Sequence, residues 1–354
     1  MKKMKWLFML VALAALVFAM AACSSSDKGS EAPSAGNNAP SEEEPAVKKD
    51  AIHIKFGHTL SETSSWQKGA LYFKQRVEEL TDGRYTVDIF PNGQLSSGDQ
   101  TKALEMLRQG TYDVDITSAL IWSNLDERIN ITAMPWILPS IDYAEEMLQG
   151  EPGEMLLDIL RENGVTPVAI GETGYRQIFT NKRQITSPDD LKDMKIRVPG
   201  TKMFIDLYKE LGADPTAMNF TEVFTALQQG TIDGMEGVVD VVVSSRFHEV
   251  LDYLSVNNYN FDIFYLTFSN KFYESLSDED KELIMQAGKE ATQHATEYSR
   301  KANEEALELL KNELEVAELT EEQIEVFKQA AAPIYEMYKD TFPEELRQAF
   351  NYIE

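Results

Sequence analysis

Apolar and polar residues alternate with short periods along most of the chain after its N-terminal region. Residues 52–56 alternate in steps of two, as in a half-exposed strand, and the same alternation returns at 85–89. Between them, an apolar stripe with helical spacing runs from Ser64 or Ser65 to about Leu80. A strand, a helix and a second strand in this order favour a parallel sheet. We therefore predict an α/β fold.

A much longer helical pattern begins after Ser277, which forms a capping-box-like pair with Asp280. The periodicity continues for some 35 residues without a proline, which corresponds to about 50 Å of helix. One alternative is a mobile terminal helix. We expect instead that this helix is the only element long enough to touch both halves of the fold. A short strand around 315–319 and helices from Glu321 and Pro343 are predicted to complete the chain.

A faint internal repeat connects two distant segments. Residues 107–113 resemble residues 227–233, and in each copy a helical pattern ends at a glycine, Gly110 or Gly230, before an aspartate. Glycine suits the left-handed position that closes many helices. Helix-to-strand joints can look alike by chance, but two similar α/β lobes explain the repeat better.

The N-terminal region has a different character. Residues 1–22 place three lysines before an apolar run that ends in small residues, which is typical of a signal peptide. Cys23, the only cysteine of the chain, follows at once, as in a lipoprotein cleavage site; a free buried thiol is the alternative. Residues 23–50 have almost no large apolar side chains, so they cannot bury enough surface to repay ordering. We predict a disordered tether behind a lipidated Cys23.

Composition excludes several functions. The net charge of −26 argues against a nucleic-acid partner, because phosphates require clustered lysine and arginine. It does not exclude an anionic ligand, because local cations determine a site and surface charges are screened within about 10 Å. The four histidines are not spaced for a metal, and no hydrolase or phosphate-loop motif is present. We expect no enzyme activity, no metal and no cofactor, with a secreted hydrolase as a remote alternative.

Two arginines are candidates for binding an anion. Arg197 lies in the apolar run Lys195–Pro199. A guanidinium keeps its charge and is rarely buried unpaired, so either an acidic side chain or a bound anion must pair with it. Arg176 lies in the glycine-containing segment 171–177, which suits an irregular crossing between lobes. A surface arginine is the alternative for this second position.

Segment 186–237 contains Lys-Ile-Arg-Val-Pro, Leu-Gly-Ala and Asp-Gly-Met-Glu-Gly, and it resembles the solute-binding proteins of tripartite ATP-independent periplasmic (TRAP) transporters of the DctP type. The resemblance covers nearly the whole body from Ile52. It implies that Arg197 clamps a substrate carboxylate, that Arg176 also reaches the ligand, and that Phe220 is an apolar wall. It further implies a two-lobed periplasmic-binding-protein-like fold with a long helix spanning both lobes.

The other predicted ligand-binding residues are Thr59, Gln100, Ser118, Gly237 and Tyr259. Thr59 follows the first strand, at the end where ligands of open α/β sheets gather. Gly237 stands where many relatives have asparagine, and Gln100 and Ser118 stand where sialic-acid binders have acidic side chains. The aromatic walls are predicted to come from Trp122, Trp136, Tyr175 and Tyr259. These departures favour a smaller or less hydroxylated organic acid.

We assign residues 51–173 and about 262–303 to lobe I, and 174–261 and about 304–354 to lobe II. The lobes are expected to close on one small organic anion. The resemblance implies an extracytoplasmic, lipid-anchored monomer that delivers its ligand to TRAP membrane subunits for sodium-coupled uptake. A binding protein of another importer class and a ligand-sensing lipoprotein are the alternatives.

Overall fold

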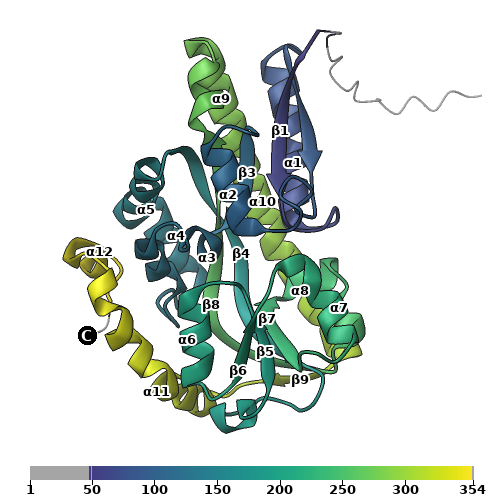
Figure 1. Cartoon of the computed structure of the whole chain (residues 1–354), viewed down its shortest axis with the longest axis vertical. Helices are drawn as coiled ribbons and strands as arrows, with labels where there is room; N and C mark the ends of the chain where they lie inside the picture. The colour runs from purple at the N-terminus through teal and green to yellow at the C-terminus, as the bar shows by residue number, and fades with distance from the viewer. Residues whose placement is uncertain (1–47, 49, 353–354) are drawn as a thin grey trace, which may run out of the picture. The chain divides into compact units, whose positions relative to one another are not determined.

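One mixed β-sheet runs through the part of the chain that the computed structural model describes, Lys48 and residues 50–352 (Figure 1). The strand order is β2-β1-β3-β8-β4-β7-β5-β6, and β9 pairs with β8. The strands are β1 Ile52–His58, β2 Tyr85–Phe90, β3 Val114–Ser118, β4 Val165–Thr180, β5 Lys195–Val198, β6 Asp214–Ala217, β7 Gly234–Val238, β8 Tyr253–Ser269 and β9 Glu315–Glu318. The predicted signal peptide, Cys23 and nearly all of the tether lie outside the described residues.

The first strand, helix and strand have the predicted arrangement. Helix α1 spans Ser65–Leu80, and the side chain of Ser64 accepts a hydrogen bond from the backbone N–H of Gln67, which satisfies one of the free N–H groups at a helix start. Strands β1 and β2 are parallel, with Ile52 opposite Tyr85. The α/β prediction is therefore confirmed for this region.

Strands β4 and β8 are the longest of the sheet and pair with each other as an antiparallel ribbon. On one side β8 pairs with β3, and on the other β4 pairs with β7, so the ribbon joins both halves of the sheet. The pairing shifts register between Glu172 and Gly174 and again between Arg176 and Ile178, and such irregularities bend a strand locally. The expectation that only the long helix reaches both halves is therefore wrong.

The long helix α10 spans Asp278–Glu313, and Ser277 caps it by accepting a hydrogen bond from the N–H of Asp280 at 3.1 Å. It packs against α1 and β4 at one end and against α8 and β9 at the other. A Cβ added at Gly69 of α1 would lie 2.8 Å from the Cβ of Ala295. Small residues therefore let α1 and α10 approach closely.

Helices cover both faces of the sheet (Figure 1). Helices α1, α7, α8 and α10 pack on one face, and α3 to α6 with α11 and α12 pack on the other. The remaining helices are α2 Gln100–Arg108, α3 Ala119–Trp122, α4 Ile141–Gln149, α5 Glu151–Glu162, α6 Lys202–Glu210, α7 Val223–Gln228, α8 Val239–Ser244, α9 Asn270–Ser275, α11 Glu321–Tyr338 and α12 Glu344–Ala349. Within the described residues, none of the helices combines the length and apolar character needed to cross a membrane.

The internal repeat corresponds to two equivalent joints. Gly110 and Gly230 have φ angles of +65° and +66°, as expected for left-handed residues at helix ends. The carboxylate of Asp113 accepts the backbone N–H of Lys55 at 2.8 Å, and that of Asp233 accepts the N–H of Lys195 at 3.0 Å. Each aspartate thus ties a helix-to-strand turn to the neighbouring parallel strand, so the repeat reflects a shared local structure.

Candidate ligand-binding site

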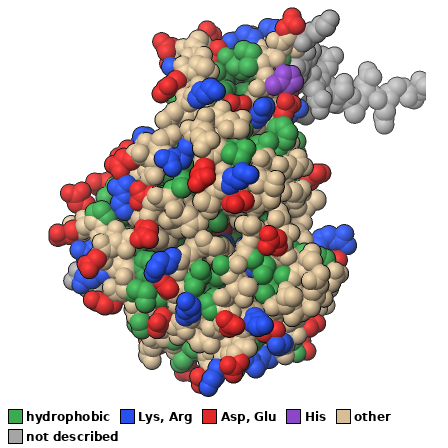
Figure 2. Space-filling model, viewed as in Figure 1, with side chains coloured by type: hydrophobic (Ala, Val, Ile, Leu, Met, Phe, Trp, Pro, Cys, Tyr) green, Lys and Arg blue, Asp and Glu red, His purple; other side chains and the backbone are tan. Residues whose placement is uncertain are grey.

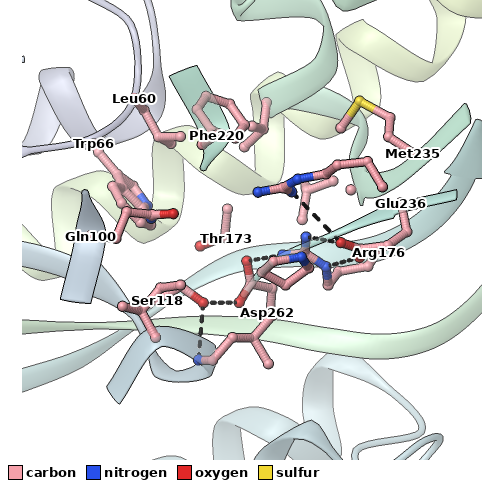
Figure 3. A pocket seen from close by; sticks show the side chains of 17 residues that line it. Leu60, Trp66, Gln100, Ser118, Thr173, Arg176, Phe220, Met235, Glu236 and Asp262 are labelled. Atoms are coloured by element: carbon pink, nitrogen blue, oxygen red, sulfur yellow. Dashed lines mark hydrogen bonds and ion pairs between the residues drawn. The ribbon is translucent and has the colours of Figure 1, made fainter. Parts of the chain in front are cut away.

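A small cavity of about 50 Å³ lies where α1 and α2 face the irregular part of β4 and the strands β5 and β7 (Figure 3). Both halves of the sheet contribute to it. Its lining consists of Leu60, Trp66, Gln100, Ser118, Leu120, Ile121, Thr173, Arg176, Arg197, Pro199, Phe220, Met235, Glu236, Gly237, Val238, Val241 and Asp262. Six of the eight predicted ligand-binding residues are among them, and Thr59 and Tyr259 are not.

Arg197 lies on β5 and is 2% exposed. Its Nε and Nη2 donate to the backbone oxygen of Met218 at 3.3 and 3.0 Å, and its Nη1 is 4.0 Å from Oε1 of Glu236. Burial lowers the pKa of Arg197 to about 10, and the positive charge of Arg176 acts in the same direction. Arg197 therefore keeps its charge at neutral pH, and no carboxylate of the described residues is in hydrogen-bonding contact with it.

Arg176 is paired quite differently. Its Nε and Nη2 donate to the two carboxylate oxygens of Glu236, and its Nη1 donates to Asp262 at 2.8 Å. Burial acts to lower the pKa of Arg176, but the charges of Glu236 and Asp262 raise it well above its usual value. The alternative of a surface arginine does not apply to Arg176, because it is 8% exposed and is held by two buried carboxylates.

Tyr259 stands behind Glu236 rather than in the cavity. Its hydroxyl donates to Oε2 of Glu236 at 2.9 Å and accepts from the hydroxyl of Tyr208 at 3.2 Å. The prediction that Tyr259 forms a wall of the site does not match this placement. The structure instead makes Tyr259 a support for Glu236, and Glu236 in turn orients Arg176.

Asp262 is the acidic lining residue that sequence reasoning missed. It lies on β8 and is 4% exposed, and it accepts from Oγ of Ser118 at 2.6 Å as well as from Arg176. Burial raises the pKa of Asp262, while Arg176 and Ser118 act against the shift. A signal was present, because a lone acid in the run Asn260–Phe264 poses the same pairing problem as Arg197. Ser118 therefore lines the site, but its hydroxyl is engaged by this carboxylate.

Three further residues line the cavity, two with a polar side chain and one with no side chain. The hydroxyl of Thr173 is buried and has no hydrogen-bond partner within the described residues. Figure 3 shows the Gln100 side chain beside Trp66 and directed toward the cavity. Gly237 lines the cavity without a side chain. Thr173 and Gln100 can therefore supply uncommitted hydrogen-bonding groups to a ligand, and Thr173 was not predicted.

The apolar wall comes from different residues than expected. Phe220 lines the cavity as predicted, and its ring centre is 6.0 Å from Cζ of Arg197. Trp66 of α1 faces it from the other half and was not predicted as a wall (Figure 3). The other predicted aromatic walls, Trp122, Trp136 and Tyr175, are absent from the lining. Trp122 is instead fully buried in a hydrophobic core.

Thr59 lies at the rim, in a neighbouring surface depression that also contains Phe220 and Ser244. Close by, the hydroxyls of Ser61 and Thr63 both donate to the backbone oxygen of Ser244, at 3.0 and 3.1 Å. These bonds join the start of α1 to the end of α8. Thr59 is therefore placed beside contacts that close the cleft, and not inside the cavity.

A cleft between two α/β lobes that contains a buried, incompletely paired arginine is the kind of site found in a solute receptor. The chain belongs to the family of bacterial extracellular solute-binding proteins, family 7 (DctP), whose model matches residues 56–341. Members of this family are extracytoplasmic receptors of TRAP transporters, so this protein is a TRAP solute-binding protein and not an enzyme.

Individual relatives agree in sequence and in structure. A solute-binding protein of Roseobacter denitrificans is 37% identical over 70% of this chain and 74% of its own. The galactonate complex of a sugar acid binding protein from Advenella mimigardefordensis is 30% identical, covers 87% of this chain and 98% of its own, and superposes with a TM-score of 0.82. The succinate complex of a TRAP solute-binding protein from Sulfurospirillum deleyianum is 28% identical over 86% and 99%, with a TM-score of 0.79. The predicted two-lobed fold is thereby confirmed.

Proposed function

We propose that this protein is a lipid-anchored receptor that binds one small organic acid between its lobes and delivers it to TRAP membrane subunits for sodium-coupled uptake. The observation that carries the proposal is Arg197, a buried permanent cation whose Nη1 lies 4.0 Å from Glu236 and makes no hydrogen bond to any carboxylate of the described residues. A ligand carboxylate supplies the missing anion, and arginine can bind it through two parallel hydrogen bonds.

The lining supports a small and weakly hydroxylated acid. Among the described lining residues, Gln100, Thr173 and the indole N–H of Trp66 offer uncommitted polar groups, whereas most other lining residues are apolar. The ligands bound by two relatives, galactonate and succinate, define the range of polarity and charge of the acids to be tested. A thermal-shift panel of lactate, glycerate, succinate, gluconate and galactonate, followed by calorimetry, tests the proposal. A panel in which no acid stabilises the protein contradicts it.

Lobe closure is expected to alter the long helix and the central ribbon. We propose that residues 51–173 and about 262–303 move against 174–261 and about 304–354, because register shifts in β4 lie at the boundary and α10 contacts both parts. Hydrogen exchange with and without ligand should show changed protection along α10 and around Gly174. If the changes in protection are confined to the cavity lining, α10 is a rigid support that does not respond to ligand binding.

The anchor is tested by Cys23→Ser. Two acyl chains on one cysteine give stable membrane attachment, whereas one chain does not. The variant is expected to release the protein from the membrane fraction or to remain uncleaved, which fractionation and mass analysis of the N-terminus distinguish. A variant that is cleaved and membrane-bound like the natural protein contradicts the lipid anchor but not the ligand site.

A further inference from the structure

The cavity contains two positive and two negative side chains, and this balance constrains what can bind. Arg176 and Arg197 supply the positive charges, and Glu236 and Asp262 supply the negative charges. All four residues are at most 8% exposed. An anion that enters such a dry site leaves it with one uncompensated negative charge, which is costly in a low-dielectric environment.

The two carboxylates are not held equally well. Glu236 accepts two hydrogen bonds from Arg176 and a third from the hydroxyl of Tyr259. Asp262 accepts one from Arg176 and one from Ser118. Asp262 is therefore the carboxylate that gains a proton more easily when negative charge is added nearby.

The geometry also places Asp262 where an added anion would act on it. Asp262 on β8 faces Arg176 of β4, the charge of Glu236 on β7, and Ser118 at the end of β3. Arg197 of β5 lines the same cavity of about 50 Å³. A carboxylate bound to Arg197 enters the same cavity as the Asp262 carboxylate, and like charges in one buried site favour protonation of one of them.

We infer that Asp262 takes up one proton from solvent when the organic anion binds, and that the new O–H then donates a hydrogen bond to the ligand. This inference rests on the proposed function. The proton adds to one carboxylate oxygen, no other bond changes, and the occupied site is again neutral. Asp262 thus becomes a ligand-contacting residue that couples binding to proton uptake.

The inference names a ligand class. One proton compensates one negative charge, so a monocarboxylate is accommodated without excess charge and a dicarboxylate is not. Succinate and its half-amide succinamate have nearly the same shape and differ by one charge. Succinamate is expected to bind at least about tenfold more tightly at neutral pH, and tighter binding of succinate would overturn the charge argument.

The pH dependence has a definite sign. Binding raises the pKa of Asp262 above its value in the free protein, so uptake occurs between the two values. In that window the dissociation constant is expected to rise by about tenfold for each pH unit. Below the free-state value Asp262 is already protonated, and affinity becomes independent of pH.

Calorimetry of the purified protein tests the inference, with lactate, glycerate, succinamate and gluconate as monocarboxylate probes. Titration of the tightest of these in buffers with different ionisation enthalpies gives the number of protons taken up, and close to one is expected near neutral pH. Asp262→Asn is expected to bind with no proton uptake and with a flat pH profile. Asp240→Asn is the matched control, because Asp240 is a second buried carboxyl group at the cleft that is absent from the cavity lining.

Burial raises the pKa of Asp240 to about 6, with Ser65 opposing the shift, so Asp240 is a competing acceptor of the proton. If Asp262 accepts the proton, the Asp240→Asn variant keeps the uptake. If Asp262→Asn does not fold, Ser118→Ala provides a second test, because losing its hydrogen bond should protonate more of Asp262 in advance and reduce the uptake. Binding without proton uptake in the natural protein overturns this inference alone, whereas no binding by any acid contradicts the proposed function.

Discussion

Replacing Arg197 with alanine is expected to weaken binding of the organic acid by about a hundredfold or more, which corresponds to about 2.7 kcal/mol. The guanidinium is 2% exposed, and the Glu236 carboxylate lies 4.0 Å from it, beyond hydrogen-bonding distance. Removing it leaves the ligand carboxylate buried without this cation, and losing one partner of a desolvated charge pair costs several kcal/mol. Calorimetry with the tightest acid of the panel measures the loss.

Two further variants separate charge from geometry. Arg197→Lys keeps the charge but loses the planar fork, so it should also bind poorly. Arg128→Ala is the control, because Arg128 pairs with Asp126 and Glu162 outside the cavity. The Arg197 variants should keep the fold, since Arg197 makes no close ion pair in the free protein. Affinity near that of the natural protein in Arg197→Ala, with the fold intact, would place the carboxylate elsewhere.

Arg176→Ala is expected to act mainly on stability, with a loss of about 3–5 kcal/mol in the free energy of unfolding. The reason is that Glu236 and Asp262 both lose their hydrogen-bonding cation while remaining buried. Urea denaturation of the variant against the natural protein measures the change.

The pH dependence distinguishes this explanation from a packing defect. Burial raises the pKa of Asp262 and Arg176 opposes this shift, so without Arg176 the pKa of Asp262 lies further above its value in the unfolded chain. The neutral form of Asp262 is tolerated at low pH, and stability is lost as pH rises through the raised pKa. The variant should therefore be closest to the natural protein at acidic pH, and Glu236→Gln in the same chain, which removes the second buried charge, should restore part of the loss. A deficit that is the same at all pH values contradicts this account.

Helices and strands were predicted correctly where one face of the element is exposed to solvent. The boundaries of α1 and α10 follow from their apolar stripes and from caps at Ser64 and Ser277. The ribbon of β4 and β8 was not found, because both faces of β8 are buried: Phe261 and Ile263 belong to one core, and Phe264 and Leu266 belong to another. A strand that is apolar on both sides has no period of two to detect.

Site residues could be predicted only where the residue type and its neighbours in sequence indicate a binding role. Arg197 was identified because a permanent charge in an apolar strand needs an anion. Which anion it meets depends on register across three strands, since Glu236 lies opposite Ile178 in the pairing of β7 with β4. The sequence therefore could not show that Arg176 pairs with both Glu236 and Asp262, or that Arg197 has no hydrogen bond to a carboxylate of the described residues. The same limit applies to Thr59 and Tyr259, which lie close in sequence to lining residues but outside the cavity.

The antiparallel ribbon also determines when this chain can fold. Strand β3 is the inner strand of the β2-β1-β3 group, and its partner β8 is made only after β4, β5, β6 and β7. During synthesis the N-terminal half therefore carries an unpaired sheet edge until residues near Phe268 have been translated. Such long-range pairing is slow, so the sheet cannot be completed until most of the chain has been synthesised. A chain that delays its own folding in this way is well suited to pass through an export channel before its sheet closes.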